Sequence, residues 1–167
     1  YKGLLGASGR KPIVSPDGVH WKTIGAKTIP SSDTSTLIYD ELGKRYLAIL
    51  KNGTKFGRSA AVAFSTDFKT WTTPRTTFHT DEPDQKFALN RIQKRLADPN
   101  MQNPMFNDPH PETGWTPPGF DPGIGKSRIP TWRAETYKLG VFPYEGLYIG
   151  MPQIYYPPGP ALPARNN

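Results

Sequence analysis

The stretch ETYKLGVFPYEGLYIGMPQIYY, residues 135–156, decides the fold, and its pattern is typical of a β-hairpin. Its first half mixes aromatic, β-branched and small side chains, which favour strands. Pro143, Glu145 and Gly146 supply turn residues, and a second apolar run follows over residues 147–156. The pattern therefore predicts two antiparallel strands that are joined by a short turn.

A second segment of the same design, DTSTLIYDELGKRYLAIL, begins at Asp33. Its turn is expected at residues 40–43, and its second strand starts near Tyr46. Asp33 lies thirteen positions before Tyr46, and Glu135 lies thirteen positions before Tyr148. Because both hairpins begin with a carboxylate at the same spacing, we expect them to be equivalent and their acids to have related roles.

A shorter repeat links two other parts of the chain. The pattern Ser-x-Asp-x-x-x-Trp occurs twice, fifty residues apart, and a Gly-Arg pair precedes each copy. Ser and Asp side chains in such turns accept bonds from backbone N–H groups, so both aspartates are interpreted as structural rather than catalytic. A β-rich repeat with a period of about 40–50 residues is typical of propeller blades. The two copies are Ser15, Asp17 and Trp21, and Ser65, Asp67 and Trp71.

These repeats predict an all-β chain that forms part of a five-bladed type of β-propeller. Residues 1–25 form the outer part of a blade without its innermost strand, residues 33–78 a complete blade, and residues 135–156 the inner half of a third. A closed propeller needs about four blades or more, so the remaining blades are expected from missing sequence or from another chain. The complete blade is predicted to have strands near 34–40, 45–51, 58–65 and 71–78.

The predicted domain covers residues 1–156 and contains a long irregular loop over residues 79–134. Loops of this length in compact domains are usually functional or disordered. A short helix is predicted within it, over residues 85–97. Residues 157–167 form a Pro-rich tail without a strand pattern.

Composition narrows the classes of function. The 167 residues suit one domain, 35% of them are hydrophobic, and no apolar run is long enough for a transmembrane helix. The absence of cysteine excludes disulfides and thiol chemistry. The net charge of +7 is spread along the chain, apart from Arg91, Lys94 and Arg95, so neither a nucleic-acid nor a membrane partner is expected.

The chemistry is predicted to depend on Asp33 and Glu135. If inner strands converge on an axis, both acids face one pocket at the mouth of the central channel. Burial and mutual repulsion can then separate their pKa values, as glycoside hydrolysis by a carboxylate pair requires. The alternative is that both acids cap turns. Glu145 is a further candidate, although its turn should lie at the opposite end of the hairpin.

The long loop contains the other candidate binding residues. Asp81 and Asp84 flank a proline and could bind sugar hydroxyls or a cation, or could simply be solvated. The rings of Trp115, Phe120 and Trp132 could stack on sugars or pack against the protein. The three histidines have no metal-ligand spacing, so no metal site is predicted.

The phrases SPDGVHW, DTSTLIYDELGKRYLA, GRSAAVAFSTDFKTW and VFPYEGLYIG together resemble the five-bladed propeller glycoside hydrolases of families 43 and 32. The resemblance covers residues 1–80 and 133–156. It implies three carboxylates at the starts of inner strands, of which Asp33 matches the middle, orienting Asp and Glu135 the general acid. The first Asp is expected upstream of Tyr1. The fructosidase signatures are absent, which favours the arabinanase-like side.

The resemblance implies a secreted or periplasmic hydrolase, a glycosidase that acts in polysaccharide degradation by paired-carboxylate catalysis on a carbohydrate substrate. A non-catalytic carbohydrate-binding propeller and a protein-interaction scaffold are the alternatives. No cofactor is expected. Many propeller hydrolases hold a central structural cation, and no ligand spacing in this chain identifies one.

Overall fold

The structure is a computed structural model that describes residues 1–97 and 134–156. The chain divides into two compact units. The first unit comprises Tyr1–Thr80 and Glu135–Tyr155, and the described part of the second comprises residues 81–97, Ala134 and Tyr156. The boundary after Thr80 falls next to the start of the predicted loop at residue 79.

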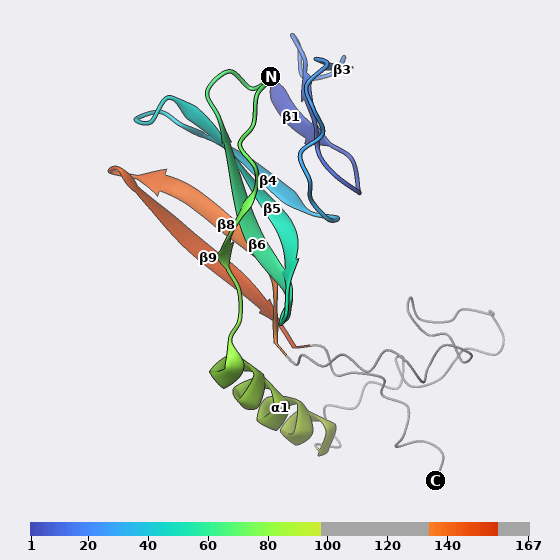
Figure 1. Ribbon diagram of the computed structural model, residues 1–167, viewed down its shortest axis with the longest axis vertical. Coiled ribbons are helices and arrows are strands. Elements are labelled where there is room, and N and C mark those ends of the chain that lie inside the picture. The colour runs from blue at the N-terminus through green and yellow to red at the C-terminus, as the bar shows by residue number, and fades with distance from the viewer. Residues whose placement is uncertain (98–133, 157–167) are drawn as a thin grey trace, which may run out of the picture. The chain divides into compact units, whose positions relative to one another are not determined.

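The first unit consists of three antiparallel sheets (Figure 1). The all-β character that the sequence predicts is confirmed for it, while the arrangement of the sheets as propeller blades stays a prediction. The strands in their sheet order are β1 (Lys2–Leu5), β2 (Lys11–Val14) and β3 (Lys22–Thr23); β4 (Ser35–Asp40), β5 (Arg45–Thr54), β6 (Gly57–Ser65) and β7 (Arg75–Phe78); and β8 (Glu135–Tyr144) and β9 (Leu147–Tyr155).

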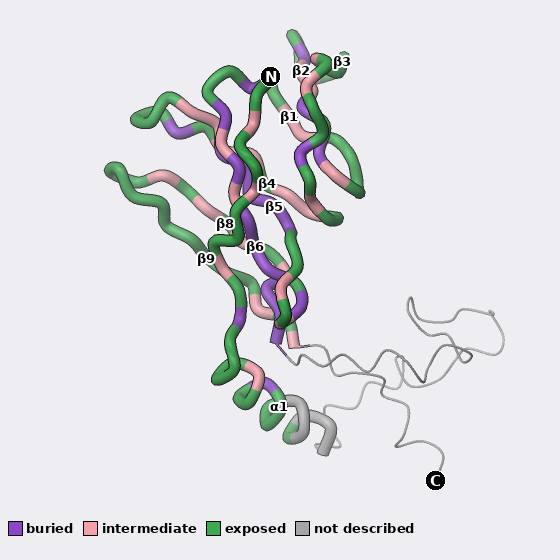
Figure 2. The backbone as a smooth tube through the Cα atoms, viewed as in Figure 1, coloured by how far each residue is buried: buried purple, intermediate pink, exposed green. Residues whose placement is uncertain are grey.

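The four-stranded sheet contains the four strands predicted over residues 34–78, to within about four residues at every strand end. Its two central strands, β5 and β6, contain most of the buried residues of this sheet, as the purple segments of Figure 2 show. Small side chains predominate at this centre, so other segments can approach it closely. The core cluster comprises Ile29, Ala48, Leu50, Ala61 and Ala63, against which Leu4 and Trp71 pack.

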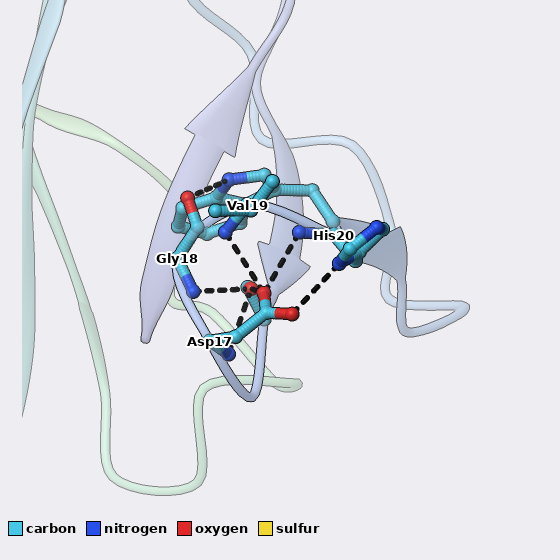
Figure 3. Close-up of polar contacts among 6 residues, drawn as sticks. Asp17, Gly18, Val19 and His20 are labelled. Atoms are coloured by element: carbon cyan, nitrogen blue, oxygen red, sulfur yellow. Dashed lines mark hydrogen bonds and ion pairs between the residues drawn. The ribbon is translucent and has the colours of Figure 1, made fainter.

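The two Ser-x-Asp-x-x-x-Trp copies form the same turn. Asp17 Oδ1 accepts bonds from the N–H groups of Val19 and His20, each at 2.8 Å (Figure 3). Asp67 Oδ1 accepts the equivalent bonds from Lys69 and Thr70, at 2.8 and 2.7 Å. Both aspartates therefore have the structural role that the sequence predicts.

The position of this turn relates the first two sheets to each other. One copy joins β2 to β3 and the other joins β6 to β7. The three-stranded sheet therefore corresponds to the last three strands of the four-stranded sheet. In each copy the indole N–H donates to the carbonyl of the residue three positions earlier, from Trp21 to Gly18 and from Trp71 to Phe68.

The two hairpins are less alike than their equal spacing predicts. Residues 41–44 connect β4 to β5, whereas only Glu145 and Gly146, both at positive φ, connect β8 to β9. The shorter turn is offset by a longer β8, which contains a register irregularity between Thr136 and Lys138. The two acids therefore take different positions relative to their strands: Asp33 lies in a bend before β4, and Glu135 is the first residue of β8.

The second unit contains the helix α1 (Glu82–Ala97), which begins three residues before the predicted start. The N–H of Asp81 donates to the Asp84 carboxylate at 3.0 Å, and the N–H of Asp84 donates to the Asp81 carboxylate at 3.1 Å. This reciprocal capping satisfies N–H groups at the helix start, which explains the earlier beginning. Within the described residues, no helix has both the length and the apolarity needed to cross a bilayer.

Candidate functional site

A cavity of about 360 Å³ lies in the first unit where both hairpins begin. Residues at the start of β4 and β8 form two of its walls, and β5 and the start of β6 contribute further residues. Asp33 lines this cavity, as do Thr136 and Tyr137, the neighbours of Glu135. The structure thus brings the starts of the two hairpins to one cavity, although only one of the two predicted acids lines it.

Asp33 presents an accessible carboxylate to the cavity. Its side chain is 61% exposed, and its Oδ1 lies 2.7 Å from Nζ of Lys51, whose side chain is only 4% exposed. The contact with the Lys51 ammonium lowers the pKa of Asp33 below its usual value. Asp33 is therefore ionised at neutral pH, and it can accept hydrogen bonds or orient a ligand.

Glu135 has a different environment, because it is 1% exposed and both of its oxygens are engaged. Oε1 accepts a bond from the backbone N–H of Arg58 at 2.8 Å, and Oε2 pairs with the Arg58 guanidinium. These contacts hold the first residue of β8 against the start of strand β6. They therefore position Thr136 and Tyr137 at the cavity. A direct role in acid catalysis would require Arg58 to release Oε2.

Arg10 holds the first hairpin in a related way. The residue is 2% exposed, and its guanidinium donates from Nε to Ser35 Oγ at 2.7 Å. It also donates to the carbonyls of Gly6 and Gly9. Each Gly-Arg pair of the sequence repeat therefore contacts the start of the next hairpin. The repeat was visible in the sequence, but this role of its arginines was not predicted.

Cationic groups gather around the ring of Tyr137. Lys51 Nζ lies 4.2 Å from the ring centroid, Lys138 Nζ lies 5.9 Å from it, and the Arg58 guanidinium lies 6.0 Å from it. Arg58 also lies 5.8 Å from the ring of Tyr155, in a neighbouring hollow. A cation and the face of an aromatic ring attract each other. The three cationic side chains around Tyr137 also make this region electropositive.

Glu145, Asp81 and Asp84 are not among the described residues that line this cavity. Glu145 occupies the two-residue turn beyond the far end of β8, at the end of the hairpin opposite Glu135. Asp81 and Asp84 cap α1 in the second unit. Trp115 and Trp132 lie outside the described residues, as does Phe120.

Neither a metal centre nor a known relative identifies the site. Over residues 1–97 and 134–156, the structure contains no group of three or more His, Asp or Glu side chains that could hold a metal ion. Comparison of the chain with known protein families, curated proteins and solved structures found no match. The proposed function therefore rests on the geometry of the cavity.

Proposed function

We propose that this chain is part of a β-propeller glycoside hydrolase and that the cavity at the start of β4 and β8 binds the sugar. The observation that carries this proposal is that two hairpin starts contribute to one cavity, with the carboxylate of Asp33 exposed in it. Hydrolysis of a glycosidic bond needs carboxylates that converge on the scissile linkage.

The repeated contacts between sheets support the propeller part of the proposal. Arg10 bonds to the start of β4, and Arg58 bonds to the start of β8, from equivalent positions after a glycine. A contact that recurs between successive sheets is what a repeat architecture requires. Further blades, from other sequence or another chain, would complete the ring and supply the third carboxylate.

Asp33 suits the role of orienting carboxylate or of base, because its lowered pKa keeps it ionised. In that form it can accept a bond from a sugar hydroxyl or from the attacking water, but it has no proton to donate. The general acid of this proposal is Glu135, which would take up a proton from water once Arg58 Nη1 has moved away from Oε2 and would then transfer that proton to the leaving oxygen.

A non-catalytic carbohydrate-binding propeller is the second candidate, and one observation favours it. Both oxygens of Glu135 are occupied by Arg58, and the side chain is buried. A carboxylate in this setting serves the architecture, and the cavity alone would then bind sugar without cleaving it.

The test measures release of reducing sugar and binding in parallel. The wild-type chain and its Asp33→Asn and Glu135→Gln variants are incubated with arabinan, xylan and acidic polysaccharides, and circular dichroism confirms folding. We expect Asp33→Asn to lower turnover by about 10²-fold or more while binding survives. Binding without release by the wild type would support the second candidate. Turnover that neither substitution changes would overturn the proposed roles.

A further inference from the structure

Two buried donors line the cavity. In the part of the chain that the structure describes, Thr136 Oγ1 has no hydrogen-bond partner, and the buried ammonium of Lys51 pairs with one oxygen of Asp33. Both residues line this cavity. Buried polar groups in folded proteins nearly always have partners for their donors, so the unused donors at this cavity indicate a ligand.

The two residues come from different strands, Lys51 from β5 and Thr136 from β8, which argues against a local accident of one loop. Thr136 is 1% exposed. Ser59 pairs with Asn52, which follows Lys51 in β5, so the side chain of Ser59 lies on the opposite face of the sheet from Lys51 and does not belong to this pair. Lys51 pairs electrostatically with Asp33 at 2.7 Å, but an ammonium group carries three N–H donors, and one carboxylate oxygen does not use them all.

The charge of the lining specifies the chemistry of the ligand. Arg10, Lys51 and Lys138 line the cavity, and Asp33 is the single acid among its lining residues. The Arg10 guanidinium already donates to Ser35 and to backbone carbonyls, so it contributes charge rather than free donors. A cationic ammonium and a hydroxyl donor that line one cavity complement a group that only accepts hydrogen bonds and is negatively charged.

We infer that the cavity binds an anionic saccharide, whose carboxylate or sulfate group receives bonds from Lys51 and Thr136. The inference rests on the proposed function, since it names the class of sugar for the same cavity. Uronic acids and sulfated sugars share this chemistry. Asp33 then lies next to the anionic group through their common partner Lys51, where it can accept a bond from a neighbouring sugar hydroxyl.

The experiment is calorimetric titration of the full chain with short saccharides in matched charged and neutral pairs. Tetragalacturonate is compared with neutral galactotetraose, and a sulfated galactose disaccharide with its unsulfated form. We expect at least one charged member to bind about tenfold more tightly than its neutral counterpart. The two pairs distinguish a carboxylate from a sulfate. Equal affinity for both members of both pairs would overturn the inference.

Variants distinguish binding at this site from non-specific attraction of an anionic saccharide to a chain of net charge +7. Lys51→Met should abolish the preference for the charged member, whereas Lys22→Met, on the exposed strand β3, should preserve it. Thr136→Val should weaken binding about tenfold, and Thr136→Ser, which retains a hydroxyl, should not. Equal losses in Lys51→Met and Lys22→Met, or in both Thr136 variants, would show non-specific binding and overturn the inference.

The outcomes also distinguish this inference from the proposed function. Tight binding of a charged saccharide without release of reducing sugar supports the inference and contradicts hydrolysis. Cleavage of neutral glycans without preference for charge supports hydrolysis and contradicts the inference. The binding result for Lys51→Met is interpreted only if this variant unfolds thermally with the same cooperativity as the wild type. Thr136→Val provides the same test without changing a charge.

Discussion

Arg58 and Glu135 are 77 residues apart in sequence, yet the backbone N–H of Arg58 lies 2.8 Å from Glu135 Oε1 and its guanidinium pairs with Oε2. The two ends of this contact differ in exposure, because the Glu135 side chain is 1% exposed and the Arg58 side chain 44%. The contact is one polar attachment of the second hairpin to the four-stranded sheet, and it positions Thr136 and Tyr137.

Loss of the Arg58 side chain should therefore destabilise the first unit. Arg58→Met leaves the buried Glu135 carboxylate without its ionic partner, and we expect the free energy of unfolding to fall by roughly 3 kcal/mol. The double variant Arg58→Met/Glu135→Gln should recover part of this loss, because no charge is then buried. Urea denaturation of the four proteins of the cycle measures the coupling. Strictly additive effects would contradict a direct pair.

Two buried serines of β6 should respond in opposite directions to replacement by alanine. Ser59 Oγ has no partner in the described structure, whereas Ser65 Oγ donates to Asp67 Oδ1 at 3.0 Å. Ser59→Ala should stabilise the ligand-free protein by about 1 kcal/mol, and Ser65→Ala should destabilise it by about the same amount. The two residues are 1% and 4% exposed, so each is the other's control in the same denaturation experiment. Destabilisation by Ser59→Ala would mean that its hydroxyl has a stabilising partner.

The turn aspartates should make stability sensitive to acid. Bonds from the N–H groups of Thr70 and Lys69 lower the pKa of Asp67 far below its ordinary value of 3.8. A lowered folded-state pKa gives stability that is present above 3.8 and is lost as the pH falls through the folded value. Asp67→Asn should thus lower the melting temperature at neutral pH, and its difference from wild type should shrink in acid. A difference that stays constant between about pH 6 and pH 2 would contradict this account.

Tyr148 should make stability sensitive to alkali. Burial, followed by its hydrogen bond to Asp40, raises the pKa of this phenol above 10.0. A raised folded-state pKa gives stability that is complete below 10.0 and is lost as the pH rises through the folded value. The melting temperature of wild type should therefore fall more steeply above about pH 10 than that of Tyr148→Phe. Parallel curves for the two proteins would contradict the prediction.

At neutral pH, Tyr148→Phe should also lower stability, because the hydroxyl accepts bonds from Arg45 Nε at 3.0 Å and Nη2 at 2.7 Å. Tyr39→Phe is the matched control, since Tyr39 is about equally exposed on the neighbouring strand β4. The control should change the melting temperature less than Tyr148→Phe does.

Local patterns in the sequence predicted the sheets well. Alternating apolar residues and turn residues located both hairpins, and the Ser-x-Asp-x-x-x-Trp repeat located the two equivalent turns. These features depend on residues close together in the chain, so spacing is informative about them. The start of α1 was predicted too late because the cap formed by Asp81 and Asp84 was interpreted as loop.

The candidate site was harder to predict, because it depends on contacts between distant segments. Equal spacing from Asp33 and Glu135 to their tyrosines suggested equivalent acids, but a shorter turn and the irregularity in β8 produce that equality by different routes. The sequence also does not reveal that Arg58 occupies Glu135 or that Ser59 lacks a partner. The first fact arises only when β6 and β8 are brought together, and the second only when the side chain of Ser59 is buried in the fold.

The left-handed position of the repeated turn has one further consequence. It is glycine in one copy, Gly18 with φ 82°, and phenylalanine in the other, Phe68 with φ 65°. Phe68 is 1% exposed, and its ring lies 5.0 Å from that of Tyr46 and 5.7 Å from that of Trp71. The two copies share a backbone but are not interchangeable modules. Grafting the first copy onto the second would keep the turn, relieve its backbone strain and remove the aromatic ring that packs against Tyr46 at the start of β5.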